Sequence, residues 1–302
     1  MRQRRGRVFS RLFVGVVLAV GLLAASSGPA GAKNDKPKHA KNTCTGSADN
    51  FPTEVGTLSG TYSGHVKISG ACAVDAGPTT INGNLTVGPG STLIAAFASS
   101  SLTVTGNIKI QSGGTLVLGC FATSFGCFDD PNQDNPTLNG PASVGGNIIA
   151  TNALGVIVHD TSIGGNVIQH RGGGGFTCDP QGVFALLGPP AYTAYEDSTI
   201  GGSVDLKGMR GCWLGLARDQ VHHNVRVFNN RLADPDAIEI VLNNIHGNLN
   251  CRRNSMVWDS GDLTDALYPR VPQPNTVDGK RRGQCVLASP ATEGGPLGPG
   301  PF

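Results

Sequence analysis

Three acidic residues in the last third of the chain have the chemistry needed to cleave a polysaccharide. Asp234, Asp236 and Glu239 are separated by only a few positions. Hydrolysis of a glycosidic bond uses two carboxyl groups about 5–9 Å apart, and a lyase uses a base beside carboxylates and bound Ca²⁺. The Asp-Pro-Asp segment is also ordinary turn chemistry. These residues are therefore catalytic candidates only if the protein is an enzyme.

A second acidic segment could hold a calcium ion. Asp129, Asp130 and Asp134 supply the carboxylate oxygens that Ca²⁺ prefers, although a proline follows Asp130 and the segment can equally form a turn. Zinc is disfavoured because the chain has no paired Cys-x-x-Cys motif. Ca²⁺ is therefore the one cofactor that the sequence suggests.

The chain also offers aromatic side chains that could stack on sugar rings. Tyr192, Tyr195 and Trp213 are the candidates for such a binding surface. Packing inside the protein is the alternative use of the same residues. The sequence alone does not separate these two roles.

The first 32 residues have the features of a secretory signal peptide. A basic start is followed by an apolar run from Leu12 to Ala25 and by the small residues Ala30-Gly31-Ala32. The eight cysteines all follow this segment, and an even number in an exported chain predicts disulfides. Many pairings are possible, and we expect the sequential one, because it suits a fold in which each segment touches only its neighbours: Cys44–Cys72, Cys120–Cys127, Cys178–Cys212 and Cys251–Cys285.

The charge balance gives no sign of a polyanionic partner. The chain has 23 basic and 21 acidic residues, but five arginines lie in the predicted signal peptide. The remaining 18 basic and 21 acidic residues give a net charge of −3. Because nucleic-acid binders carry a basic excess, we expect no nucleic-acid partner. An extracellular glycan or the cell wall is the partner that export suggests.

A short repeat governs the middle of the chain and predicts its fold. The pattern apolar-x-Gly-Asn-apolar recurs every 19–24 residues, with two steps of about double length. Eight residues two places before the glycine position and eight residues two places after it are apolar, while the next position after these is mostly polar. This alternation indicates strands, and the period indicates a solenoid. We therefore predict an all-β parallel β-helix of about eight or more rungs.

The asparagine of each repeat is expected to have a structural role. Glycine allows a sharp bend, and asparagine tolerates left-handed backbone angles. Stacked asparagine side chains can also hydrogen-bond from rung to rung. The predicted ladder contains Asn84, Asn107, Asn147, Asn166, Asn224 and Asn248. On the polar face, Asp205 and Arg226 are expected to form a surface ion pair.

The Gly-Asn repeat, over roughly residues 60–260, resembles the right-handed β-helix repeats of secreted bacterial proteins. It is also similar to the short valine-rich rungs of bactofilins, which are polymer-forming bacterial cytoskeletal proteins, and to exported proteins of high-GC Gram-positive bacteria. The resemblance implies a right-handed parallel β-helix and supplies no activity. The predicted signal peptide, the eight cysteines and the long inserts depart from the bactofilin pattern.

These observations divide the chain into five segments. We expect a signal peptide at 1–32, a flexible polar leader at 33–50 and a β-helix at 51–260, with inserts near 121–138 and 172–196. A C-terminal cap at 261–288 and a disordered Gly/Pro-rich tail at 289–302 complete the map. The function that fits best is a secreted structural or surface-associated protein that contacts glycans without catalysis. A polysaccharide lyase or hydrolase and an end-to-end polymer are the alternatives.

Overall fold

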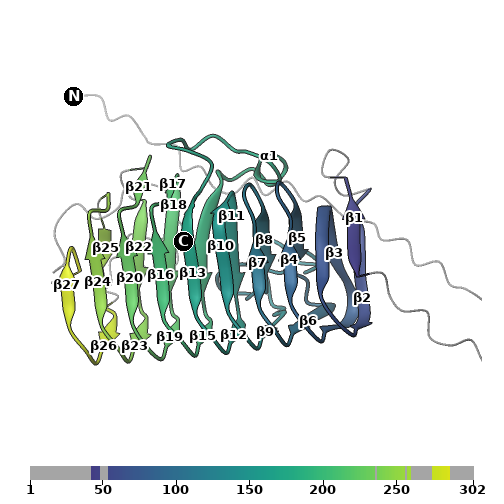
Figure 1. Ribbon diagram of the computed structural model, residues 1–302, viewed down its shortest axis with the longest axis horizontal. Coiled ribbons are helices and arrows are strands. Elements are labelled where there is room, and N and C mark those ends of the chain that lie inside the picture. The colour runs from purple at the N-terminus through teal and green to yellow at the C-terminus, as the bar shows by residue number, and fades with distance from the viewer. Residues whose placement is uncertain (1–41, 48–53, 235–236, 256, 260–273, 286–302) are drawn as a thin grey trace, which may run out of the picture.

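The chain forms a parallel β-helix, which confirms the predicted fold class (Figure 1). The computed structural model describes residues 42–47, 54–234, 237–255, 257–259 and 274–285. Each turn of the coil contributes short strands that pair in parallel with the strands of the turns before and after it. The predicted signal peptide and tail, together with Asp236, lie outside the described residues.

The first of three stacks of strands contains ten successive parallel strands, which we call the first sheet. Its members are β1 (Thr43–Gly46), β3 (Val66–Ile81), β4 (Leu85–Val87), β7 (Ile108–Ile110), β10 (Ile148–Ala153), β13 (Val167–Gly172), β16 (Val204–Lys207), β20 (Val225–Phe228), β24 (Leu249–Arg252) and β27 (Arg281–Gly283).

The other two stacks are built in the same way. Following the long strand β3, the second sheet contains β5 (Thr92–Ala95), β8 (Thr115–Leu118), β11 (Gly155–His159), β14 (Tyr192–Glu196), β18 (Trp213–Ala217), β22 (Ile238–Val241) and β25 (Val257–Asp259). The third sheet continues from β3 to β6 (Ser100–Val104), β9 (Ala142–Val144), β12 (Thr161–Ile163), β15 (Thr199–Ile200), β19 (Gln220–Val221), β23 (Asn244–Ile245) and β26 (Thr276–Val277).

Four elements remain to be placed. Strand β2 (Gly56–Tyr62) pairs with β3 along both the second and the third sheet. The short strands β17 (Arg210–Gly211) and β21 (Arg231–Leu232) pair only with each other. The four-residue helix α1 (Phe184–Leu187) belongs to the second insert. No helix of the described residues is long and apolar enough to cross a membrane.

The core of the coil consists of the apolar columns that the repeat predicts. All sixteen residues of the two columns are buried, and the most exposed of them, Tyr62, is only 6% exposed. These residues are Tyr62, Ile81, Val104, Val144, Ile163, Ile200, Val221 and Ile245 before the glycine position, and Val66, Leu85, Ile108, Ile148, Val167, Val204, Val225 and Leu249 after it. Burial of such side chains is the main force that holds the rungs together.

The predicted asparagine ladder runs along the edge of the first sheet. The Oδ1 atom of Asn107 accepts hydrogen bonds from both the backbone N–H and the side-chain amide of Asn147, each at 2.8 Å. The same two bonds join Asn84 to Asn107, Asn147 to Asn166 and Asn224 to Asn248. Ser203 bridges the gap between Asn166 and Asn224.

The glycines of the repeat serve a different purpose from the one expected. None of the ladder asparagines has a positive φ, and neither do the glycines that precede them. Instead, a Cβ atom on Gly106 would lie 2.6 Å from Asn84 Oδ1 and 2.7 Å from the Gly83 carbonyl. Glycine is required because consecutive rungs approach closely at this corner.

A second ladder, which is buried, joins successive rungs at another corner of the coil and was not predicted. The backbone N–H of Ser198 donates to Asp219 Oδ1, the N–H of Asp219 donates to Asn243 Oδ1, and the N–H of Asn243 donates to Asn275 Oδ1. The amide groups of Asn243 and Asn275 also donate to carbonyls of the preceding rung, those of Leu216 and Ile240. Asp219 has no amide, and its Oδ2 finds no hydrogen-bond partner within the described chain.

The four disulfides follow the sequential pairing that we expected. They join Cys44 to Cys72, Cys120 to Cys127, Cys178 to Cys212 and Cys251 to Cys285. Each bond connects parts of the coil, or a loop and the coil, that lie close in sequence. Two of the disulfides therefore brace neighbouring rungs, Cys44–Cys72 and Cys251–Cys285, and the other two tie an insert to the coil.

Three of the expected segments need correction. Residues 43–46, placed in the flexible leader, form β1, which pairs with β3 and is fixed by the Cys44–Cys72 bond. Residues 276–283, placed in the C-terminal cap, form β26 and β27, so this part is a further rung. The second insert is also shorter than expected, because β13 extends to Gly172 and β14 begins at Tyr192.

The asparagine ladder yields a first prediction, for Asn147→Ala. This change removes the acceptor for the Asn166 backbone N–H and the bonds to Asn107, so we expect a loss of about 1–3 kcal/mol in the free energy of unfolding. Chemical denaturation followed by circular dichroism measures it. The control is Asn82→Ala, because Asn82 is exposed and outside the ladder. Equal losses in the two variants would contradict a stabilising ladder.

The buried ladder yields a second prediction, for Asp219→Asn. Burial raises the pKa of Asp219 well above its ordinary value, and its Oδ2 has no hydrogen-bond partner among the described residues. In the asparagines of the ladder, a side-chain amide nitrogen stands in the place of this oxygen. A carboxyl group with a raised pKa stabilises the fold when protonated, and this contribution falls as the pH rises from about 4, the unfolded-state pKa, to the folded-state pKa. Compared with the wild type, the variant should therefore gain stability as the pH rises.

The measurement is the difference in free energy of unfolding between the two proteins at a series of pH values. Its slope should approach, at most, about 1.4 kcal/mol per pH unit. Asp75→Asn, which removes an exposed carboxylate, is the matched control. A difference for Asp219→Asn that stays constant with pH would show that the carboxyl group is not held protonated.

Candidate functional site

The predicted catalytic acids do not form an open site. Glu239 lies on β22 and is 4% exposed. Asp234 follows β21, and its Oδ2 accepts a hydrogen bond of 3.0 Å from the indole N–H of Trp213. Asp236 lies outside the described residues. The two acids that can be placed therefore have structural surroundings rather than those of an accessible acid–base pair.

The predicted calcium ligands hold the first insert in shape. Asp130 is 3% exposed and accepts hydrogen bonds from the backbone N–H groups of Asn132, Thr137 and Leu138, at 2.7–2.8 Å. These bonds, that of Asn132 most strongly, lower the pKa of Asp130. Asp129 accepts bonds from the backbone of Ala98 and Ser99. The carboxylates of Asp129, Asp130 and Asp134 do not converge on one point.

The predicted aromatic platform is largely internal. Tyr195 is fully buried, and its hydroxyl donates to Gln169 Oε1 at 3.0 Å, so it cannot stack on a ligand. Tyr192 lies between Phe184 and Trp213, with ring centroids 5.8 and 5.9 Å away. Tyr192 and Trp213 are half-buried, and these rings pack the second insert against the second sheet. The expectation of a sugar-stacking side chain is therefore corrected for Tyr195.

A buried ionic cluster lies where β11, β14 and β18 end. The guanidinium of Arg218 donates to Glu196 Oε2 at 2.6 Å and to both carboxylate oxygens of Asp197. His159 Nε2 lies 3.5 Å from Glu196 Oε1, and the ring of His159 stacks on Phe125 of the first insert at 4.6 Å. Burial lowers the pKa of His159 to about 3, so the ring is neutral at neutral pH.

This cluster contains the donor set of a metal site but is organised around an arginine. His159, Glu196 and Asp197 offer ligand atoms within 4.8 Å of one another. However, Arg218 engages both carboxylates, and Ser124 Oγ donates to Asp197 Oδ2 at 2.7 Å. The arrangement therefore ties the first insert to the coil, and a cation could bind only by displacing Arg218.

The exposed surface of the first sheet carries a line of cations that sequence reasoning missed. Lys207 on β16, Arg226 on β20, Arg252 on β24 and Arg282 on β27 are all exposed, and we call these four residues the basic strip. Lys207 and Arg252 lie in one column with Phe228 between them. Arg226 and Arg282 lie in the next column with Asn250 between them. Four consecutive rungs thus contribute one cation each, alternating between two columns.

The alternation has a physical reason. Neighbouring rungs are about 4.8 Å apart, and like charges directly opposite each other on adjacent strands are destabilising. Alternating columns keeps one charge on every rung while increasing the separation between charges. None of the four forms an ion pair with a described residue. The expected Asp205–Arg226 pair is absent, and Asp205 Oδ2 instead lies 3.9 Å from His170 Nε2.

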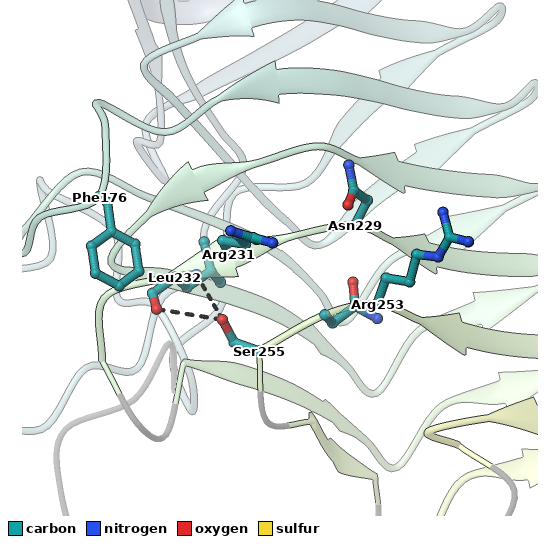
Figure 2. Close-up of a pocket in the computed structure, with 7 residues that line it drawn as sticks. Phe176, Asn229, Arg231, Leu232, Arg253 and Ser255 are labelled. Atoms are coloured by element: carbon teal, nitrogen blue, oxygen red, sulfur yellow. Dashed lines mark hydrogen bonds between the residues drawn. The ribbon is translucent and has the colours of Figure 1, made fainter.

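A shallow pocket of about 670 Å³ adjoins the basic strip at the corner after β20 and β24 (Figure 2). It is lined by Phe176, Asn229, Arg231, Leu232, Arg253, Asn254 and Ser255, and we call it the Phe176 pocket. Arg231 and Arg253 are exposed and form no ion pair with a described residue. Arg231 also lies in register with the exposed Arg210 of the neighbouring rung. The pocket therefore adds Arg231 and Arg253 to the exposed cations of this surface.

The chain has no match among family models, curated proteins or solved structures that would indicate its family. Its candidate site consequently rests on geometry and charge, and the strongest feature is the surface formed by the basic strip and the Phe176 pocket.

Proposed function

We propose that this chain is an exported, non-catalytic β-helix that binds an acidic extracellular polymer, such as an anionic cell-wall glycan, along its first sheet. The observation that carries the proposal is the basic strip, in which four consecutive rungs each present one exposed cation that forms no ion pair with a described residue. A linear polyanion lying along the helix axis would meet these charges in sequence. Export is part of the proposal and is supported by the N-terminal sequence and by the four disulfides.

A rigid coil is well suited to this role. The backbone of the strip needs no ordering upon binding, because β16, β20 and β24 pair with rungs on both sides, β27 pairs with β24, and the asparagine ladder joins the rungs. A preorganised array loses little conformational freedom when a ligand binds. Binding of a charged polymer to such an array is expected to weaken as salt increases, since cations on the protein replace the counterions of the polymer.

The third prediction concerns binding of polygalacturonate and poly(glycerol phosphate), with neutral dextran as the uncharged reference. Both acidic polymers should bind at low salt, and their affinity should fall steeply with ionic strength. The double variant Arg226→Gln/Arg252→Gln should weaken binding roughly ten- to thirty-fold at low salt, at about 1 kcal/mol per lost cation. Isothermal titration calorimetry over a salt series measures both effects.

The matched control is Lys67→Gln/Lys109→Gln, which removes two exposed cations from earlier rungs of the same sheet, where no adjacent rung carries one in the neighbouring column. This variant should bind almost as the wild type does. An equal loss in both variants would mean that net charge, rather than the strip, controls binding. Release of new reducing ends or unsaturated products from either polymer would contradict a non-catalytic role.

A further inference from the structure

We propose that the Phe176 pocket is a subsite for a single acidic sugar, with Phe176 stacking on the ring and Arg231 and Arg253 binding its carboxylate or phosphate. This inference rests on the proposed function, because it assigns one residue of the bound polymer to a defined place. A volume of about 670 Å³ lies within the range of small-molecule sites. The pocket brings together the two kinds of side chain that such a ligand requires.

The aromatic side is an exposed phenylalanine. Phe176 is 65% exposed, and it is the most exposed large apolar side chain of the described residues. In Figure 2 its ring stands at one rim of the pocket, with Arg231 between it and Asn229. An apolar ring held in water beside polar groups offers a flat face on which a sugar ring can stack.

The loop that carries Phe176 is fixed in place. The neighbouring Gly175 donates its backbone N–H to the Arg210 carbonyl at 3.0 Å, which attaches the loop to β17. Two residues after Phe176, Cys178 is bonded to Cys212. The Gln181 side chain closes the loop through a 2.9 Å hydrogen bond to the Gly174 carbonyl. Phe176 is therefore presented by a braced loop.

The charged side is a group of arginines with no counterion in the described chain. Arg231 lies in register with Arg210, so two like charges are held on adjacent strands, which is unfavourable without an anion between or above them. Guanidinium groups bind carboxylate and phosphate through paired hydrogen bonds. Asn229 and Ser255 add polar groups to the same lining.

The backbone at Arg253 has the left-handed conformation that this corner of the coil adopts in several rungs. Arg253 has a φ of 59°, a left-handed conformation that is unfavourable for a residue with a long side chain. Two rungs earlier, the equivalent corner position is Gly208, with a φ of 70°, where no such penalty arises. Asn152, Arg171 and Asn229 lie at the same corner of other rungs with φ of 52°, 60° and 58°, so the left-handed backbone is a feature of this corner of the coil. The Arg253 side chain extends from this corner and lines the pocket.

The experiment measures binding of four small probes by ligand-observed NMR and calorimetry: glucuronic acid, glucose 6-phosphate, glucose and inorganic phosphate. At least one acidic sugar should bind the wild type, at least tenfold more tightly than glucose and more tightly than inorganic phosphate. Which acidic sugar binds better distinguishes a uronic acid from a sugar phosphate as the natural residue. The full chain after signal-peptide removal is the protein used.

Variants separate the two halves of the pocket. Arg231→Gln/Arg253→Gln should reduce binding of the acidic sugar at least tenfold. Phe176→Ala should reduce its affinity to about that of inorganic phosphate, whereas Leu186→Ala, which removes another exposed apolar side chain from the same insert, should have no effect. Circular dichroism and thermal midpoints check that each variant folds as the wild type does.

Two results would overturn the inference. One is the absence of acidic-sugar binding by the wild type at millimolar concentration; the other is acidic-sugar binding that Phe176→Ala and the arginine variant leave unchanged. The basic-strip variant Arg226→Gln/Arg252→Gln distinguishes this failure from failure of the proposed function. It should weaken polymer binding without changing the affinity for the small acidic sugar. Polymer binding and sugar binding can therefore be lost independently of each other.

Discussion

The in-register stacking of parallel rungs is the constraint on which the whole structure depends. Every side chain lies about 4.8 Å from the equivalent side chains of the rungs before and after it. Each column must therefore consist of residues that can lie next to residues of the same type. Apolar residues do so by packing. Amides do so by hydrogen bonding, as where the side-chain oxygen of Asn107 accepts a hydrogen bond from the side-chain nitrogen of Asn147. Charged residues do not, because stacked like charges repel each other.

The outward column of the third sheet shows how the fold meets this constraint when charge is not needed. It is uncharged from end to end: Thr61, Thr80, Thr103, Ser143, Ser162, Thr199, Gln220, Asn244 and Thr276. The first sheet of the same coil carries outward charges at Lys67, Lys109 and Asp205, and each of its last four rungs presents a cation. Because stacking disfavours such an arrangement, the basic strip requires an explanation other than solubility, and binding of an anion provides one.

The fold could be predicted from the sequence because the repeat places the same residue types at the same corner of every rung. The sixteen core residues, the four disulfides and the Asn84–Asn248 ladder all follow from that spacing. The ladder through Asp219 and Asn243 escaped notice because its members are of three residue types, serine, aspartate and asparagine, and lie outside the Gly-Asn motif. The basic strip escaped because its cations alternate between two columns, so that each column contains only two of them.

The overall charge concealed the basic strip for a related reason. The chain after residue 32 has a formal charge of −3, yet many of its acids are engaged within the structure. Asp129 and Asp130 accept backbone N–H groups, Glu196 and Asp197 bind Arg218, and Asp219 lies inside the second ladder. The four cations of the basic strip form no ion pair with a described residue. A chain with a net negative charge can therefore present a positive face. Of the acids that were catalytic candidates, Asp234 binds the Trp213 indole and Glu239 is buried, so both are poorly placed to act on a polymer outside the coil.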